Sequence, residues 1–120
     1  MKILFLGDVV GLSGCRKITK DLLGQIKKNN IDFVIINAEN ADDTGVGLTK
    51  EICKNFFENG VDVITTGNHV WDQKDIMNFI DKENRLLRPK NLFEPAPGRG
   101  FEIYKINKNY RVGVLNLMGN

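Results

Sequence analysis

Three short, predominantly apolar segments, spaced by about 30 residues, constrain the fold of this chain most strongly. They predict strands near residues 2–7, 33–37 and 61–65. Helical patterns lie between them, and one strand–helix–strand unit takes roughly 30 residues. Segments that are apolar throughout, rather than alternating, are typical of a parallel sheet that is covered on both faces. The sequence therefore predicts an α/β fold built on a parallel sheet.

The helical segments carry start and stop signals. Apolar residues recur with helical spacing after Ser13, which is a plausible N-cap. A second helix is expected from about Thr49, with Gly60 at its C-terminal cap. Asp72 is expected to cap a short third helix, and Trp71 beside it is expected to pack in the core.

The pattern changes after residue 85. Residues 88–100 hold all three prolines and are expected to form a long ordered loop. Residues 101–106 and 111–118 are expected to form two strands around a turn at 107–109. The sequence thus predicts a C-terminal β-hairpin after the parallel part of the fold.

Composition limits the class of function. The 120 residues, 42% hydrophobic and 27% charged, fit at most one globular domain. The net charge of +2 is too small for binding to duplex nucleic acid, and no apolar run is long enough to span a membrane. No signal peptide is evident, so a cytoplasmic location is expected. Cys15 and Cys53 have neither a CxxC pattern nor histidine neighbours and are expected to pack as small hydrophobes.

Polar residues gather where the three predicted strands end. They are Asp8, Glu39, Asn40, Asn68 and His69, with intervals of 39 − 8 = 31 and 68 − 39 = 29 residues. The carboxyl ends of parallel strands share one edge of the sheet, and ligands bind at that edge. We therefore expect these side chains to converge in one cleft, although each one alone would also suit a turn or a solvated loop.

This set of residues suits a metal site. Carboxylate and amide oxygens with an imidazole are ligands of divalent manganese, iron or zinc. Two such ions would leave a positive site that fits a phosphate ester, generate the attacking hydroxide and stabilise the pentavalent transition state. His69, the one histidine of the chain, would be available to protonate the leaving oxygen, and the glycine of "GNH" permits a close backbone approach. Arg88 and Arg99 are weaker candidates for contact with a phosphate, with surface solvation as the alternative.

Six motifs carry a resemblance to a known family. They are "GDVVG", "NAEN", "GVGLT", "TGNHVWD", "RPKN" and "PGRG". Together they resemble the N-terminal half of the YmdB-like metallophosphoesterases, a branch of the calcineurin-like superfamily that hydrolyses 2′,3′-cyclic nucleotides and related phosphodiesters. The resemblance implies the N-terminal part of a layered α/β/β/α sandwich, mainly of parallel strands, and two divalent metal ions, iron first, with manganese or magnesium as alternatives. It also implies that Asp8 and Asn40 bind one ion, Glu39 bridges both, Asn68 binds the second and His69 donates a proton.

The resemblance also implies that residues 1–120 are the N-terminal portion of a single domain. Val10 stands where the superfamily commonly has a histidine, which this branch also lacks. Family members continue further and draw three more histidine ligands from their C-terminal half. The expectation is therefore a centre that is incomplete in this chain, no turnover by the chain alone, and an apolar strand near 112–117 that favours self-association as a homo-oligomer.

Other functions remain as alternatives. The main one is a non-catalytic, metal- or nucleotide-binding regulatory fragment. A dinucleotide-binding module is less favoured, because Gly7, Gly11 and Gly14 have the spacing G-x₃-G-x₂-G rather than G-x-G-x₂-G. A hydrolase of the "GDS" type would need a serine at the position of Val9.

Overall fold

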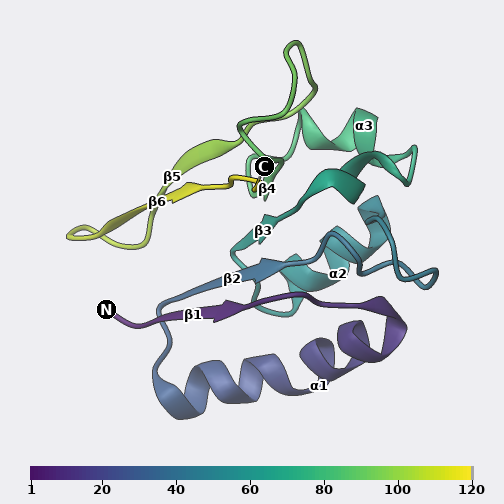
Figure 1. The fold of residues 1–120 in the computed structure, drawn as a ribbon. Helices are drawn as coiled ribbons and strands as arrows, with labels where there is room; N and C mark the ends of the chain where they lie inside the picture. The colour runs from purple at the N-terminus through teal and green to yellow at the C-terminus, as the bar shows by residue number, and fades with distance from the viewer. Residues whose placement is uncertain (120) are drawn as a thin grey trace.

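The computed structural model describes residues 1–119 and has two sheets (Figure 1). The larger is parallel, with strand order β1-β2-β3-β4, and the smaller is the antiparallel pair β5-β6. The predicted α/β fold with a C-terminal hairpin is confirmed. In chain order the elements are β1 (Ile3–Leu6), α1 (Gly11–Asn29), β2 (Phe33–Asn37), α2 (Lys50–Glu58), β3 (Val63–Thr65), η1 (Asn68–Trp71), α3 (Ile76–Ile80), β4 (Leu86–Leu87), β5 (Phe101–Lys105) and β6 (Arg111–Leu115).

The register of the parallel sheet places the ends of its strands in line. Leu6 of β1 pairs with Ile36 of β2, and Asn37 of β2 pairs with Thr65 of β3. Thr65 in turn pairs with Leu87 of β4. The segments that follow these strands therefore leave the sheet side by side, as the sequence predicts.

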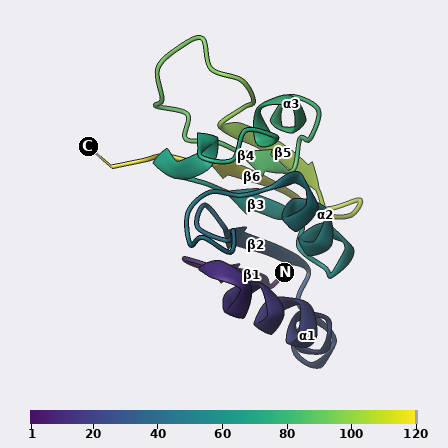
Figure 2. The ribbon, with the colours of Figure 1, turned by 90° about the vertical axis from the view of Figure 1, so that its right-hand side faces the viewer.

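Helices α1 and α2 cover one face of the parallel sheet (Figures 1 and 2). Ile18 and Leu22 of α1 and Phe56 of α2 are buried in the main core, and Leu4 and Leu6 of β1 pack against that core. Because the apolar residues of α1 recur every three or four positions, one stripe of the helix faces the sheet. The helix layer thus fixes the positions of the loops that enter and leave it.

The opposite face is covered only in part. The β5–β6 hairpin packs over β2, β3 and β4, where Phe33, Ile35, Val63, Leu87 and Val114 form a second buried cluster. Strand β1 lies outside this cover. Its Ile3 and Phe5 side chains are 45% and 59% exposed. The prediction that all three strands are covered on both faces is therefore wrong for β1, because the hairpin does not reach it.

The helix ends agree with the sequence in part. Helix α1 begins at Gly11, and Val10 at its N-cap makes no side-chain cap bond, so the prediction of Ser13 as N-cap is wrong. Thr49 is confirmed as the N-cap of α2, because its hydroxyl accepts a hydrogen bond of 3.2 Å from the Ile52 N–H. Gly60 follows the end of α2 with a φ of 99°, a conformation in which glycine is unstrained.

Three local features complete the comparison with the sequence. Asp72 ends the short 3-10 turn η1 and does not cap α3, whose N-cap position is Asp75, so that prediction is wrong. The two-residue strand β4 was not predicted. Trp71 packs against the main core, and Cys15 and Cys53 are buried free thiols, as expected. Within residues 1–119, no helix is long and apolar enough to cross a membrane.

Candidate functional site

Backbone hydrogen bonds hold the three strand-end segments together beyond the sheet. The Val9 N–H donates to the Asn37 carbonyl at 2.9 Å, and the Ala38 N–H donates to the Thr65 carbonyl at 3.1 Å. The Gly11 N–H donates to the Asn40 carbonyl at 2.9 Å. The segments carrying the predicted site residues are therefore neighbours at one edge of the sheet.

Asp8 and Asn40 form the first contact of the site. The Asn40 Nδ2 donates to Asp8 Oδ1 at 3.4 Å, a long hydrogen bond. Asp8 has a φ of 50°, in the left-handed region of backbone conformation. Residues other than glycine, asparagine and aspartate rarely adopt it. Such conformations are found often at binding sites, where the surrounding structure maintains them. The exposed Asp8 carboxylate is thus aimed by its backbone next to the Asn40 amide.

Two buried oxygens at this edge have no donor. Within residues 1–119, Glu39 Oε2 and Asn40 Oδ1 are shielded from solvent and make no hydrogen bond. An unsatisfied buried polar atom costs about 1–3 kcal/mol, and more when it is charged. A cation bound to these oxygens would supply the missing partners. These atoms are therefore the observation that most directly indicates a bound positive group.

Gly67 brings the β3 end to Glu39. A Cβ atom placed on Gly67 would lie 2.0 Å from Glu39 Oε2, so only glycine leaves room for the carboxylate. The close approach that the "GNH" motif predicts is confirmed, and the group that approaches is Glu39. Because Asn68 directly follows Gly67, its exposed side chain extends from the same turn.

His69 is held by Asp72. The His69 Nδ1 and Asp72 Oδ2 atoms are 2.7 Å apart, and the two side chains are 39% and 40% exposed. Sequence reasoning missed this role, because an aspartate ahead of a helical pattern resembles an N-cap. The signal that would have found it is the spacing, since a side chain three residues after His69 returns to the same side of a 3-10 turn.

The donor set fits divalent metal ions. Asp8, Glu39, Asn40 and Asn68 offer carboxylate and amide oxygens, which suit magnesium or manganese and, with imidazole, iron. Across residues 1–119, no group of three or more histidine, cysteine, aspartate or glutamate side chains is placed to hold a metal ion. Two carboxylates and two amides thus leave coordination positions to be filled by water or by further ligands.

The two arginines have structural partners. Arg88 is 3% exposed, so the alternative of surface solvation is wrong for it. Its guanidinium donates to backbone oxygens within the loop 88–100 and to Glu94. Arg99 donates to Glu102 Oε2 at 2.7 Å. Contact of either arginine with a phosphate stays a prediction, and for Arg88 the hydrogen-bonding capacity is already in use.

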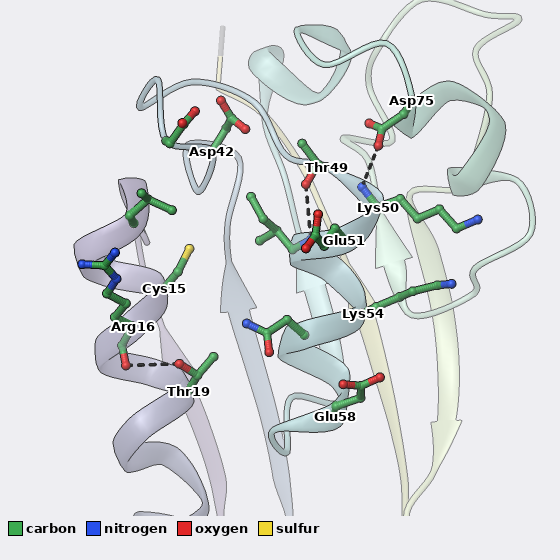
Figure 3. A pocket seen from close by; sticks show the side chains of 14 residues that line it. Cys15, Arg16, Thr19, Asp42, Thr49, Lys50, Glu51, Lys54, Glu58 and Asp75 are labelled. Atoms are coloured by element: carbon green, nitrogen blue, oxygen red, sulfur yellow. Dashed lines mark hydrogen bonds between the residues drawn. The ribbon is translucent and has the colours of Figure 1, made fainter.

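A large cavity lies elsewhere. It has a volume of about 1010 Å³ and opens between α1 and α2, where Arg16, Lys50 and Lys54 stand beside acidic side chains (Figure 3). None of the predicted site residues lines it.

The structure brings Asp8 to Asn40 and Glu39 to Gly67, while His69 is bonded to Asp72. Convergence of all five predicted side chains in one cleft therefore stays a prediction.

A family model, a curated relative and two solved structures are similar to this chain. A family model described as "YmdB-like protein" matches residues 4–120. A Bacillus subtilis protein named 2′,3′-cyclic-nucleotide 2′-phosphodiesterase is 45% identical over 120 residues, covering 99% of this chain and 44% of the relative. A crystal structure of a novel phosphatase from Mycoplasma pneumoniae superposes with a TM-score of 0.89 at 36% identity, covering 99% of this chain and 43% of that one. A hypothetical protein from Thermus thermophilus gives a TM-score of 0.88 at 33% identity, with coverages of 99% and 45%. The chain spans less than half the length of each.

Proposed function

Because the chain belongs to the YmdB-like protein family, we propose that it forms part of a metal-dependent phosphodiesterase that hydrolyses 2′,3′-cyclic nucleotides or related phosphodiesters. The names of its relatives share phosphate-ester hydrolysis as their chemistry. Since the chain covers 44% of the Bacillus relative, this activity is proposed for the full-length protein rather than for residues 1–120 alone.

One observation carries the proposal. Glu39 Oε2 and Asn40 Oδ1 are buried oxygens without a donor in residues 1–119, beside the left-handed Asp8. We assign Asp8 and Asn40 to one ion, Glu39 to both, and Asn68 to the second. These residues would hold iron foremost, with manganese or magnesium as alternatives. A bound pair of ions supplies positive charge to the phosphoryl oxygens and makes a water nucleophilic near neutral pH.

The residues of this chain hold the ions and move one proton. As the oxygen of a water adds to phosphorus, the bond from phosphorus to the departing ribose oxygen breaks. The His69 Nε2–H then protonates that oxygen, and the water proton passes to solvent. Nε2 is the available atom because Nδ1 is bonded to Asp72. One hydrogen bond therefore decides which ring nitrogen serves the reaction.

The test compares two forms of the protein. The full-length gene product is expected to hydrolyse 2′,3′-cyclic AMP with added Mn²⁺ or Fe²⁺ and to lose this activity in EDTA. The 120-residue chain is expected to show no turnover, because its oxygen ligands leave each ion largely held by water. Full-length protein that binds Mn²⁺ without hydrolysis would support the regulatory alternative. Robust EDTA-sensitive hydrolysis by the 120-residue chain would overturn the requirement for further ligands.

A further inference from the structure

The contacts of Asp72 and of the "GVGLT" segment extend the proposed role of His69 beyond the ring itself. The Asp72 carboxylate lies 2.7 Å from His69 Nδ1, and the Asp72 N–H donates to the His69 carbonyl at 3.1 Å. A side-chain bond and a main-chain bond thus link the same two residues. The imidazole is therefore restrained at Nδ1, and within residues 1–119 Nε2 makes no hydrogen bond.

The turn at Gly47 packs directly against Asp72. Gly47 has a φ of 84°, and a Cβ placed on it would lie 3.2 Å from Asp72 Cβ and 2.9 Å from Gln73 Cγ. The backbone of this turn is thus in contact with the segment that carries Asp72. Gly45 provides a contrast, because it has a φ of 83° but its Cβ would meet nothing within 4 Å.

Hydrogen bonds tie the same turn to Gln73. The Gln73 Nε2 donates to Asp42 Oδ2 at 3.2 Å and to the Val46 carbonyl at 3.3 Å. The Thr44 hydroxyl donates to Asp42 Oδ2 at 2.7 Å, and this hydrogen bond lowers the pKa of that carboxyl. Figure 3 shows Asp42 on this loop, at the rim of the α1–α2 cavity and on a different element from Asp75. The loop 42–47 thus anchors the residue next to Asp72.

We propose that Asp72 is the positioning residue for His69 and that the Gly47 turn holds Asp72 in place. The inference rests on the proposed function for its catalytic meaning. A carboxylate that accepts from Nδ1–H fixes the ring orientation and leaves Nε2 to face the leaving oxygen. When Nε2 gives up its proton, the neutral ring retains its proton on Nδ1, which is the form that Asp72 binds. Asp72 also stabilises the charged ring that donates the proton, and between the two neutral tautomers it selects the one that leaves Nε2 without a proton.

The single histidine of this chain allows a direct test without metal or substrate. Nitrogen-15 NMR of the 120-residue chain, at a pH where the ring is neutral, is expected to show the Nδ1–H tautomer. Asp72→Asn is expected to shift the ring toward the Nε2–H tautomer that free histidine prefers. Asp75→Asn removes the same charge three residues away and is expected to leave the tautomer unchanged. An Nε2–H ring in the parent chain, or identical spectra for parent and Asp72→Asn, would overturn the inference.

The activity test uses the leaving group. In the full-length protein, Asp72→Asn is expected to lower kcat for 2′,3′-cyclic AMP about 10- to 100-fold with little change in KM. For bis-p-nitrophenyl phosphate, whose leaving group needs no proton, the loss is expected to stay within about 3-fold. An equal loss on both substrates, or none, would contradict a positioning role. Failure of the parent protein to hydrolyse either substrate would instead contradict the proposed function, and the NMR result would remain interpretable.

A matched glycine pair tests the turn. Gly47→Ala is expected to shift the His69 tautomer and to lower kcat for 2′,3′-cyclic AMP in the same direction as Asp72→Asn. Gly45→Ala carries the same strain of a positive φ without the contact and is expected to leave both readouts at parent values. The same response from both variants would remove the Gly47 turn from the account.

Discussion

Two buried polar groups of this chain differ in how their hydrogen bonds are satisfied. The Arg88 guanidinium in the loop 88–100 donates to the carbonyls of Pro97 and Pro89 at 2.9 and 3.0 Å, and to Glu94 Oε1 at 3.2 Å. At the strand ends, the shielded Glu39 Oε2 receives no hydrogen bond from residues 1–119. Folded proteins satisfy nearly all their buried polar atoms, so the exceptions need an explanation. The comparison separates a polar group whose hydrogen bonds build the fold from one whose missing partner the proposed metal ion would supply.

The buried amide of Asn116, close to the unsatisfied oxygens, has its hydrogen-bond acceptors in place. The buried Asn116 amide donates to the carbonyls of Thr66 and Leu87 at 2.9 and 3.0 Å, which links β6 to the ends of β3 and β4. Thr66 directly precedes Gly67, whose backbone lies against Glu39. The missing partners at Glu39 and Asn40 are therefore confined to the site and do not reflect loose packing around it.

The largest effect is expected from removing the unsatisfied charge. Glu39→Gln in the full-length protein is expected to lower hydrolysis of 2′,3′-cyclic AMP about 100- to 1000-fold, because the carboxylate proposed to hold the metal ions is lost. Without metal, its free energy of unfolding is expected to be equal to or above that of the parent, since the carboxylate whose shielded oxygen has no donor is removed. Kinetics with Mn²⁺ and thermal unfolding in EDTA measure the two effects. The exposed Glu58→Gln is the control, and a marked loss of stability in Glu39→Gln would contradict the comparison.

For the Arg88 guanidinium, whose hydrogen bonds are satisfied, a loss of stability without a loss of metal affinity is expected. Arg88→Met is expected to lower the free energy of unfolding by about 2–4 kcal/mol, because it leaves the carbonyl oxygens of the buried Pro89 and of the half-buried Ala96 and Pro97 without this donor. The affinity for Mn²⁺ of the protein that remains folded is expected to be unchanged. Urea unfolding and metal titration check these outcomes. A fully stable Arg88→Met would show that the loop 88–100 does not depend on the guanidinium.

A smaller effect, on activity and on stability together, is expected at Gly67, whose backbone lies against the Glu39 carboxylate. Gly67→Ala places a methyl group in the position of the Glu39 carboxylate. Displacement of that carboxylate is expected to lower activity about 10-fold and stability by about 1–2 kcal/mol. Gly24→Ala, on a helix position with nothing within 4 Å, is the control and is expected to gain a few tenths of a kcal/mol or more. Parent-like activity of Gly67→Ala would mean that Glu39 does not need its observed position.

The sequence predicts those parts of the fold that local patterns encode. Strands β1, β2 and β3 follow from apolar runs, and Thr49 follows from a polar residue ahead of a helical pattern. Strand β4 was missed because two residues are too few for any periodicity. The exposure of Phe5 was also missed, because the cover of β1 depends on a hairpin about 100 residues further along the chain.

The candidate site, like the fold, has parts that local sequence patterns predict and parts that they do not. The sequence predicts that the segments carrying Asp8, Glu39 and Asn68 share one edge of the sheet, which the register confirms, while the roles of these residues stay predictions. Asp72 was assigned to a helix cap, since the sequence does not show that η1 ends before α3 begins. Arg88 was assigned to the surface or to a phosphate, because its acceptors are backbone carbonyls, which the sequence does not distinguish.

Titration of the 120-residue chain with Mn²⁺, followed by thermal unfolding, tests the central claim most directly. A ligand that binds the folded state alone raises stability with its concentration, by about 2.7 kcal/mol at 100 times Kd. We predict that Mn²⁺ raises the Tm of the parent chain, that EDTA reverses the shift, and that Glu39→Gln abolishes it. A parent chain whose Tm does not respond to Mn²⁺, or an equal response in Glu39→Gln, would contradict the assignment of the unsatisfied oxygens to a metal site.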